Sequence, residues 1–164
     1  MTAYPLRAPY PAARTTVRAA VLADVPSMEA LMAPFVRTGD LLPRSTYDLS
    51  RHIREYVVAD AGDALVGTGS LKIYSPALAE IAALAVREDR QGQGVGRALV
   101  ARVVANAREL GLAQLFGLTR KADFFLRLGF QPAARDAFPL KVWADCARCP
   151  RRHACDEVAV ALRL

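Results

Sequence analysis

The segment that most constrains the fold is a run of alternating glycines between two regular stretches. Residues 87–99 read REDRQGQGVGRAL, with Gly92, Gly94 and Gly96 at every second position. The apolar stretch EIAALAV just before it is typical of a strand, and ALVARVVANARELG just after it has the apolar spacing of a helix. The glycines therefore either permit a tight turn from strand to helix or let a ligand approach the backbone closely.

A glycine-rich turn at the start of a helix is suited to binding an anion. The first backbone N–H groups of a helix have no partner within it, and the helix dipole favours negative charge there. Glycine has no Cβ to hold a phosphate away, and Arg90 and Arg97 add positive charge. The alternative is the same turn without a ligand. The segment is not a P-loop, because no Lys-Ser/Thr pair follows, and it comes too late in the chain for a dinucleotide motif.

Capping residues and apolar spacing predict three longer helices. The first begins at Asp24 and is kinked or ended by Pro34, and the second is capped by Ser45 and Asp48. The third runs from about residue 94 to 110. The expected inner faces are Met28, Leu31, Met32 and Phe35 in the first helix, Leu49, Ile53 and Tyr56 in the second, and Leu99, Val100, Val103, Val104 and Ala107 in the third, which Gly111 ends.

Strands are expected at 15–21, on either side of Gly62 and Asp63, at 79–86, at 112–118 and after 130, with a short helix at 121–129. This order predicts an α+β chain in which a mixed sheet carries helices on both faces. The chain has 164 residues, 53% of them apolar, which suits one domain. We expect residues 1–14 to form a flexible arm and residues 15–164 to form the domain.

Composition narrows the class of partner. The net charge is +6, and arginine provides 19 of the 22 basic residues. These arginines are scattered without interleaved aromatic residues, which favours a phosphorylated small molecule over nucleic acid. The N-terminal stretch lacks the apolar region of a signal peptide, and no apolar run is long enough to span a bilayer. We therefore expect a cytoplasmic protein without a membrane partner.

The glycine segment resembles the acyl-CoA signature of the Gcn5-related N-acetyltransferases (GNAT), Q/R-x-x-G-x-G/A, which here spans Gln91 to Gly96. The resemblance covers about residues 17–130 and includes FFLRLGF late in the chain. It implies a mostly antiparallel sheet in which one pair of parallel strands splays apart, acetyl-CoA as cosubstrate, and a possible homodimer. The residues that it implies for cofactor binding are Leu84, Ala85, Val86, Gln91, Gly92, Gln93, Gly94, Val95, Gly96, Arg97 and Phe125.

The same resemblance implies the catalytic groups. The backbone N–H of Leu84 would polarise the thioester carbonyl. An acceptor amine must lose a proton before it attacks, and Glu80 is the candidate base; an exposed glutamate at the strand end is the alternative. A period of two places Glu80, Ala82, Leu84 and Val86 on one face, toward the ligand. Phe125 stands where many members have a proton-donating tyrosine, so Thr119, water or the low basicity of the thiolate must suffice.

A narrower resemblance concerns the acceptor. The stretches VRAAVLADVPSMEALMAPFVRTGDLLPRS, LAEIAALAV and LKVWADCARCPRRHACDE resemble the short, stand-alone N-acetylglutamate synthases of bacterial arginine biosynthesis. A dicarboxylate calls for a planar guanidinium, which Arg44 supplies, with Lys141 and Thr119 as further candidates. A solvated loop arginine and an ordinary surface lysine are the alternatives. Relatives often have a basic residue where Ala82 stands, so one substrate contact is absent here.

Cysteines gather in the C-terminal segment 141–157. Cys146, Cys149 and Cys155 offer three thiols, and His153 could complete a tetrahedral set for a structural zinc ion. A disulfide and three reduced thiols are the alternatives. The leading interpretation of the whole chain is an N-acetyltransferase acting on glutamate. Another amine, a protein N-terminus or a non-catalytic acyl-CoA-binding module are the other interpretations.

Overall fold

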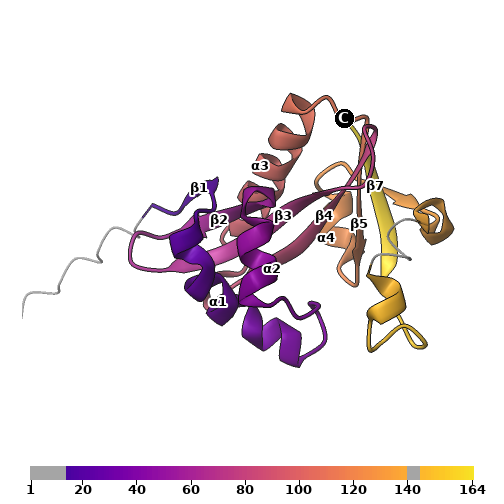
Figure 1. The fold of residues 1–164 in the computed structure, drawn as a ribbon. Helices are drawn as coiled ribbons and strands as arrows, with labels where there is room; N and C mark the ends of the chain where they lie inside the picture. The colour runs from indigo at the N-terminus through magenta and orange to yellow at the C-terminus, as the bar shows by residue number, and fades with distance from the viewer. Residues whose placement is uncertain (1–13, 140–144) are drawn as a thin grey trace, which may run out of the picture.

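The computed structural model describes residues 14–139 and 145–164 of the chain, and its centre is one seven-stranded sheet (Figure 1). The strand order is β1-β2-β3-β4-β5-β7-β6, and β4 and β5 form a parallel pair while the other neighbouring strands pair antiparallel. The strands are β1 (Thr16–Ala19), β2 (Tyr56–Asp60), β3 (Leu65–Ile73), β4 (Leu78–Val86), β5 (Gln114–Thr119), β6 (Gln131–Ala133) and β7 (Val158–Arg163). The expected mixed, mostly antiparallel sheet is confirmed.

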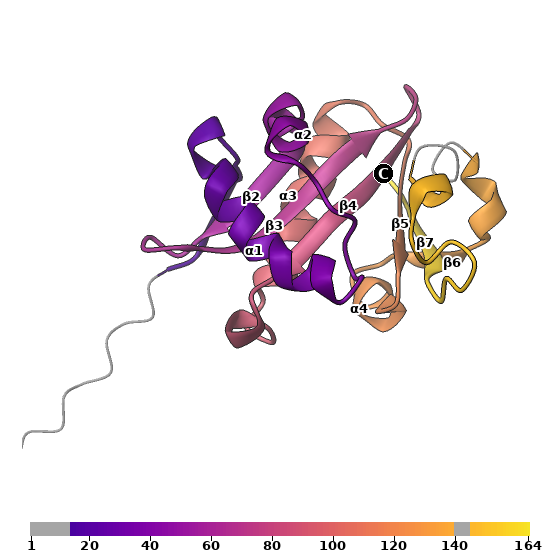
Figure 2. The ribbon, with the colours of Figure 1, turned by 60° about the horizontal axis from the view of Figure 1, so that its bottom comes forward.

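Helices cover both faces of this sheet, as expected: α1 and α2 lie on one face and α3 on the other (Figure 2). The α-helices are α1 (Val25–Arg37), α2 (Thr46–Arg51), α3 (Val95–Glu109) and α4 (Ala122–Leu126), and the short 3-10 helices are η1 (Leu22–Asp24), η2 (Ile53–Glu55), η3 (Glu88–Arg90), η4 (Arg135–Ala137) and η5 (Cys146–Arg148). Leu99 and Val103 of α3 are fully buried against the sheet, and Met28 and Leu49 pack with Val58 on the other side. No helix within the described ranges is long and apolar enough to cross a membrane.

The predicted N-terminal caps agree with the structure better than the predicted C-terminal ends of the helices. The Ser45 hydroxyl accepts from the Asp48 N–H at 3.1 Å and the Asp48 carboxylate accepts from the Ser45 N–H at 3.2 Å, so the expected capping box of α2 is confirmed. Pro34 does not end α1, which continues for three more residues to Arg37. The proline lies in the last turn of the helix, where its missing N–H removes one backbone hydrogen bond. Tyr56 does not belong to the inner face of α2, because it begins β2.

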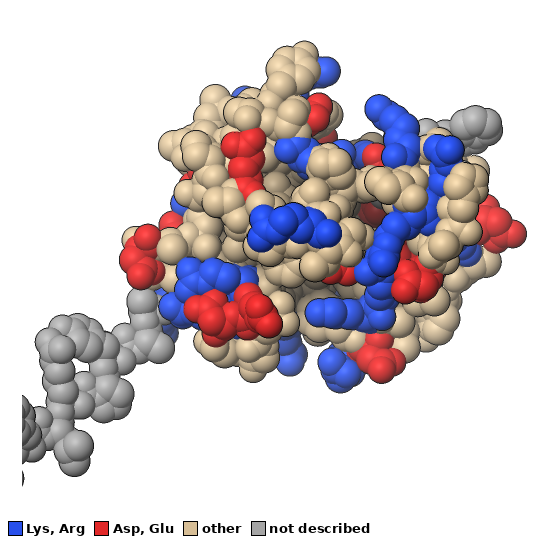
Figure 3. All heavy atoms as spheres, turned by 90° about the horizontal axis from the view of Figure 1, so that it is seen from below, with Lys and Arg blue, Asp and Glu red and all other residues tan. Residues whose placement is uncertain are grey.

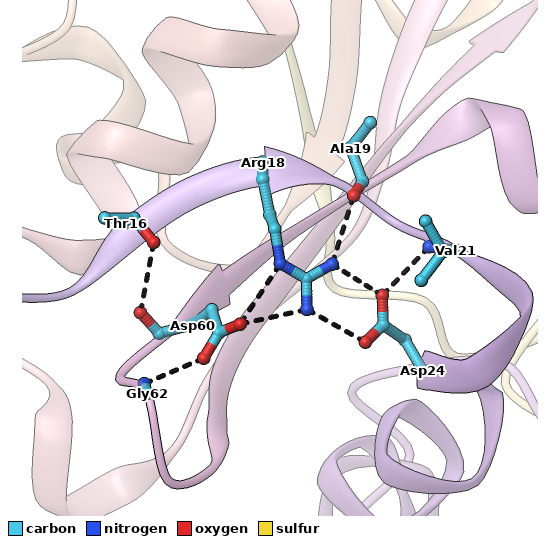
Figure 4. Close-up of polar contacts among 7 residues, drawn as sticks. All are labelled: Thr16, Arg18, Ala19, Val21, Asp24, Asp60 and Gly62. Atoms are coloured by element: carbon cyan, nitrogen blue, oxygen red, sulfur yellow. Dashed lines mark hydrogen bonds and ion pairs between the residues drawn. The ribbon is translucent and has the colours of Figure 1, made fainter.

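An ion network ties β1 to the neighbouring elements (Figure 4). The Arg18 guanidinium contacts the Asp24 carboxylate at 2.7 Å and the Asp60 carboxylate at 2.9 Å. The Asp24 carboxylate also accepts from the Val21 N–H at 2.9 Å. One side chain of an edge strand therefore holds the start of α1 and the end of β2 together.

The parallel pair is short, and this opens the sheet. β4 and β5 pair only over three positions, the last being Glu80 opposite Phe116. Beyond that point β4 continues to Val86 and β5 continues to Thr119, but the two strands no longer pair with each other. The expected splayed parallel pair is therefore confirmed, and the gap between the two strands positions the site.

Candidate functional site

The splay between β4 and β5 opens onto a cavity of about 590 Å³. Its wall is built from residues 80–86 of β4, from the glycine turn and from the segment that follows β5. Lys and Arg side chains are numerous on the face shown in Figure 3, with Asp and Glu side chains among them. The basic residues lining the cavity are Arg44, Arg97, Arg120, Lys121, Arg127 and Arg151. The cavity therefore suits an extended, anionic ligand.

The glycine turn needs glycine for backbone reasons. Gly92 and Gly94 have φ of +72° and +84°, in the left-handed region, and Gly94 is the N-cap of α3. A Cβ at either position would meet open space, so the backbone there is bare on the cavity side. Gly96 differs, because it lies inside α3 and a Cβ on it would approach the Phe124 ring at 3.3 Å. The turn thus exposes the free N–H groups at the start of α3, as an anion site requires.

Most residues expected to bind the cofactor line the cavity. Gln93 does not, and its side-chain amide donates to the Asp89 carbonyl at 3.0 Å. Val95 does not either, because it is buried in the core beneath Gly67. Arg90 also lies outside the cavity lining, unlike Arg97. The expected residues that do line it are Leu84, Ala85, Val86, Gln91, Gly92, Gly94, Gly96, Arg97 and Phe125.

A β-bulge corrects the predicted alternation of β4. Ala83 has φ +49°, and Gly69 of β3 faces two residues of β4 where one is normal. The side chains of Leu84 and Val86 therefore lie on the α3 face, next to Gly69 and Gly96. The prediction that these two share a face with Glu80 and Ala82 is wrong, because the extra residue reverses the alternation.

Glu80 lies at the point where the strands separate. It is buried, with 3% of its surface exposed, so it is not an exposed strand-end glutamate. The Tyr74 hydroxyl donates to its Oε2 at 2.8 Å. Burial and the neighbouring Glu80 charge raise the pKa of Tyr74, which keeps this donor protonated. No sequence pattern singled out Tyr74, although the short turn between β3 and β4 brings it back toward Glu80.

Two cations share one buried carboxylate, Asp145, in the cavity wall. Lys72 Nζ lies 2.7 Å from Asp145 Oδ2, and Arg44 Nη2 lies 3.9 Å from the same oxygen. Arg44 and Asp145 line the cavity together with Glu80. Lys72 and Asp145 are 73 residues apart, so no local signal in the sequence could have paired them. Lys141 lies outside the described residues.

The remaining expected site residues have ordinary partners. Thr119 lines the cavity, and its hydroxyl accepts from the Lys121 N–H at 2.9 Å. Phe125 is buried, with ring centroids 5.1 Å from Phe124 and 5.2 Å from Phe130. It packs as a core aromatic that closes one side of the cavity.

Arg120, just after β5, fastens two segments beside the cavity. Its guanidinium contacts the Asp156 carboxylate at 2.7 Å, the Asp40 carboxylate at 2.6 Å and the Gly39 carbonyl at 3.1 Å. Gly39 and Asp40 belong to the loop between α1 and α2, and Asp156 lies two residues before the start of β7. No sequence pattern singled out Arg120, because its partners come from distant parts of the chain.

The expected zinc site gains no support. Cys146, Cys149 and Cys155 are free thiols that line the cavity. Over residues 14–139 and 145–164, no three Cys, His, Asp or Glu side chains come together as a group that could hold a metal ion. His153 instead accepts a hydrogen bond from Arg152 at 2.9 Å.

Comparison with known proteins identifies the family. Residues 52–132 match the family model described as Acetyltransferase (GNAT) domain. The chain is 39% identical to an uncharacterized N-acetyltransferase of Chlorobaculum tepidum, over 94% of this chain and 99% of that protein. It is 35% identical to an amino-acid acetyltransferase of Mycobacterium tuberculosis, over 71% of this chain and 68% of that protein.

A solved structure of similar fold comes from Neisseria gonorrhoeae. It is an N-acetylglutamate synthase complexed with coenzyme A and N-acetyl-glutamate, with a TM-score of 0.83 and 32% sequence identity. The match covers 93% of this chain but 35% of the gonococcal chain, so this chain spans about a third of that protein.

Proposed function

The chain belongs to the GNAT family of acetyl-CoA-dependent N-acetyltransferases, and from that premise we propose that it acetylates the amino group of a small amino acid, L-glutamate first among the acceptors. The observation that carries this proposal is that a buried carboxylate, Glu80, and a guanidinium, Arg44, line the cavity that the glycine turn also reaches. Names of relatives agree, since they include an amino-acid acetyltransferase and an N-acetylglutamate synthase. The proposal places the chain in a reaction sequence toward arginine.

Acetyl-CoA would lie along the splayed strand. Its pyrophosphate binds the bare N–H groups around Gly92 and Gly94, with Arg97 adding a charge-assisted contact. Its pantetheine arm runs along the backbone of residues 84–86, where β4 has left β5. Extended ligands commonly add to an unpaired strand edge in this way. The thioester then lies near Glu80.

The chemistry is direct transfer from sulfur to nitrogen. Glu80, directly or through a water molecule, takes a proton from the acceptor ammonium, and the free amine attacks the thioester carbonyl. The Leu84 N–H donates to the oxygen that becomes negatively charged. Collapse of this intermediate breaks the C–S bond and releases CoA as a thiolate. The attacking nitrogen loses its second proton as the amide forms. Phe125 cannot relay this proton, so water or the Thr119 hydroxyl passes it on to the thiolate.

The choice of amino-acid acceptor depends on Arg44 and on its contact with Asp145 in the cavity wall. The Arg44 guanidinium can donate two parallel hydrogen bonds to a carboxylate of the amino-acid substrate. That carboxylate would compete with Asp145 for Arg44. A bidentate pair of this kind holds the amino acid in one orientation, with its amine toward Glu80. Lys141 is a second candidate contact for the acceptor.

The test is release of free CoA from acetyl-CoA with a panel of single amino acids, amines and peptides. We expect turnover with glutamate, and we expect Arg44→Ala to raise the KM for glutamate by about 10- to 100-fold with little change in the KM for acetyl-CoA. Arg54→Ala, an exposed arginine outside the cavity lining, is the matched control. Turnover only with another acceptor would keep the transferase and remove glutamate. Acetyl-CoA binding without any turnover would favour a regulatory acyl-CoA-binding module.

A further inference from the structure

The cysteine cluster has no role in the proposed reaction, although its three thiols line the same cavity as Glu80. Each cysteine is partly exposed, so a small molecule that enters the cavity can reach the sulfur atoms. Cys146 begins η5 and directly follows Asp145, while Cys155 lies shortly before β7. The three cysteines therefore belong to the same segment of the cavity wall as Asp145, the carboxylate that contacts Arg44.

Arg135 distinguishes two of the three thiols. Its Nη2 donates to Cys146 Sγ at 3.7 Å, and attraction to Cys155 and Cys146 raises the pKa of Arg135. Cys155 Sγ itself donates to Glu157 Oε2 at 3.9 Å. Both thiols therefore interact with the same guanidinium. Partly exposed thiols beside an arginine are the surroundings in which cysteines react with disulfides.

We propose that Cys146 and Cys155 form a dithiol site that small disulfides, including the disulfide of CoA, convert into an internal disulfide. One cysteine thiolate attacks a sulfur of the small disulfide, which forms a mixed disulfide and releases one small thiolate. The second cysteine thiolate then attacks the protein sulfur of that mixed disulfide and releases the other small thiolate. The two cysteines lose two protons and two electrons in all, and the small disulfide is reduced to two thiols.

The chain can accommodate this bond. The two cysteines are nine residues apart in a segment of turns, and Arg135 is a partly exposed residue of the three-residue helix η4. A disulfide requires the sulfur atoms to approach to about 2.0 Å, so the contact of Arg135 with Cys146 must rearrange as the bond forms. Cys149 is the competing partner, because its N–H donates to the Cys146 carbonyl at 3.2 Å within the same tight turn.

Oxidation would act on the acceptor end of the cavity. Asp145, which precedes Cys146, contacts both Lys72 and Arg44. Fixing Cys146 to Cys155 therefore restricts the carboxylate that competes with the acceptor for Arg44. This consequence rests on the proposed function, whereas the disulfide itself does not.

Thiol titration of the full chain tests the proposal without any acetyl transfer. The reduced protein is equilibrated with CoA disulfide, and free thiols are counted before and after, with the linked peptides identified by mass spectrometry under non-reducing conditions. We expect two of the three thiols to be lost and the link to join Cys146 to Cys155. A link through Cys149, no thiol loss, or three thiols protected by a bound zinc ion would each overturn the proposal.

Variants separate the chemistry from misfolding. Cys149→Ser should still lose two thiols, whereas Cys155→Ser should stop at a stable mixed disulfide carrying one CoA on Cys146. Arg135→Gln should slow the exchange about tenfold or more while leaving the same pair linked. Arg102→Gln, on the exposed side of α3, should exchange at the wild-type rate. Glutathione disulfide in place of CoA disulfide should give the same linked pair, and a different pair would count against the site. Because none of these readouts needs turnover, an inactive enzyme with the expected link would overturn the proposed function alone.

Discussion

The Tyr74 hydroxyl donates to Glu80 at the position where the two parallel strands separate. Glu80 is the last residue of β4 that pairs with β5, and on its other side it pairs with Lys72 of β3. A phenol that keeps its proton can orient a carboxylate and stabilise its charge without competing for the same proton. The splay, the buried carboxylate and its donor therefore form one unit at the end of the cavity.

The first prediction concerns the base. Glu80→Gln should lower kcat by about 100- to 10,000-fold, because the amide cannot take the proton from the acceptor ammonium. Acetyl-CoA affinity should stay near wild type, since Glu80 lies beyond the strand segment proposed to hold the cofactor. Steady-state kinetics and calorimetric titration with acetyl-CoA measure the two quantities. Unchanged turnover would remove Glu80 as the base.

The second prediction concerns the glycine turn. Gly94→Ala should weaken acetyl-CoA binding by about 5- to 30-fold, because a left-handed alanine costs about 1–2 kcal/mol and relaxing it displaces the N–H groups of the turn. Gly62→Ala is the matched control, with φ +93° and open space around its Cβ in the turn between β2 and β3. That control should lose similar stability while binding acetyl-CoA normally. Equal loss of binding in both variants would point to a general folding defect.

Local chemistry explains which features could be predicted from the sequence. The capping box at Ser45 and the glycine stop at Gly111, with φ +74°, depend on neighbours in the chain, so both follow from sequence alone. The same holds for the glycine turn before α3. The parallel pair and its splay followed from the family resemblance and not from periodicity.

Long-range features could not be predicted in this way. The bulge at Ala83 depends on how β4 fits against β3, and it reverses the predicted facing of Leu84 and Val86. The contact between Lys72 and Asp145 joins distant segments, and alternation along either segment carries no information about it. Sequence patterns therefore located the cavity but not the polar groups that meet across it.

The third prediction concerns the fastening at Arg120. Arg120→Gln should raise the KM for the acceptor roughly two- to fivefold, because exposed ion pairs are individually weak and the loop before α2 is only loosened. The KM for acetyl-CoA should not change. High salt should raise the acceptor KM of the wild type toward that of the variant, since salt screens exposed charges. An acceptor KM that is independent of both salt and Arg120 would show that the fastening does not position the acceptor loop.

The last prediction concerns acid stability. The hydrogen bond from Arg18 holds the pKa of Asp24 below its usual 3.8, and the Gly62 N–H together with Arg18 does the same for Asp60. A lowered pKa in the folded state means that the stabilisation is complete above 3.8 and is lost as the pH falls through and below that value.

Replacing Arg18 should therefore remove part of this acid sensitivity. Arg18→Met keeps the aliphatic stem and should lower the free energy of unfolding at neutral pH by about 1–2 kcal/mol, because it leaves the buried Asp24 carboxylate without its cation. The two proteins should converge only when the pH falls below the lowered pKa values of Asp24 and Asp60, since the protonated carboxyls no longer attract the guanidinium. Urea denaturation at neutral and acid pH measures both differences. If the gap between wild type and variant stays constant with pH, the stabilisation comes from packing of the arginine stem and not from its charge.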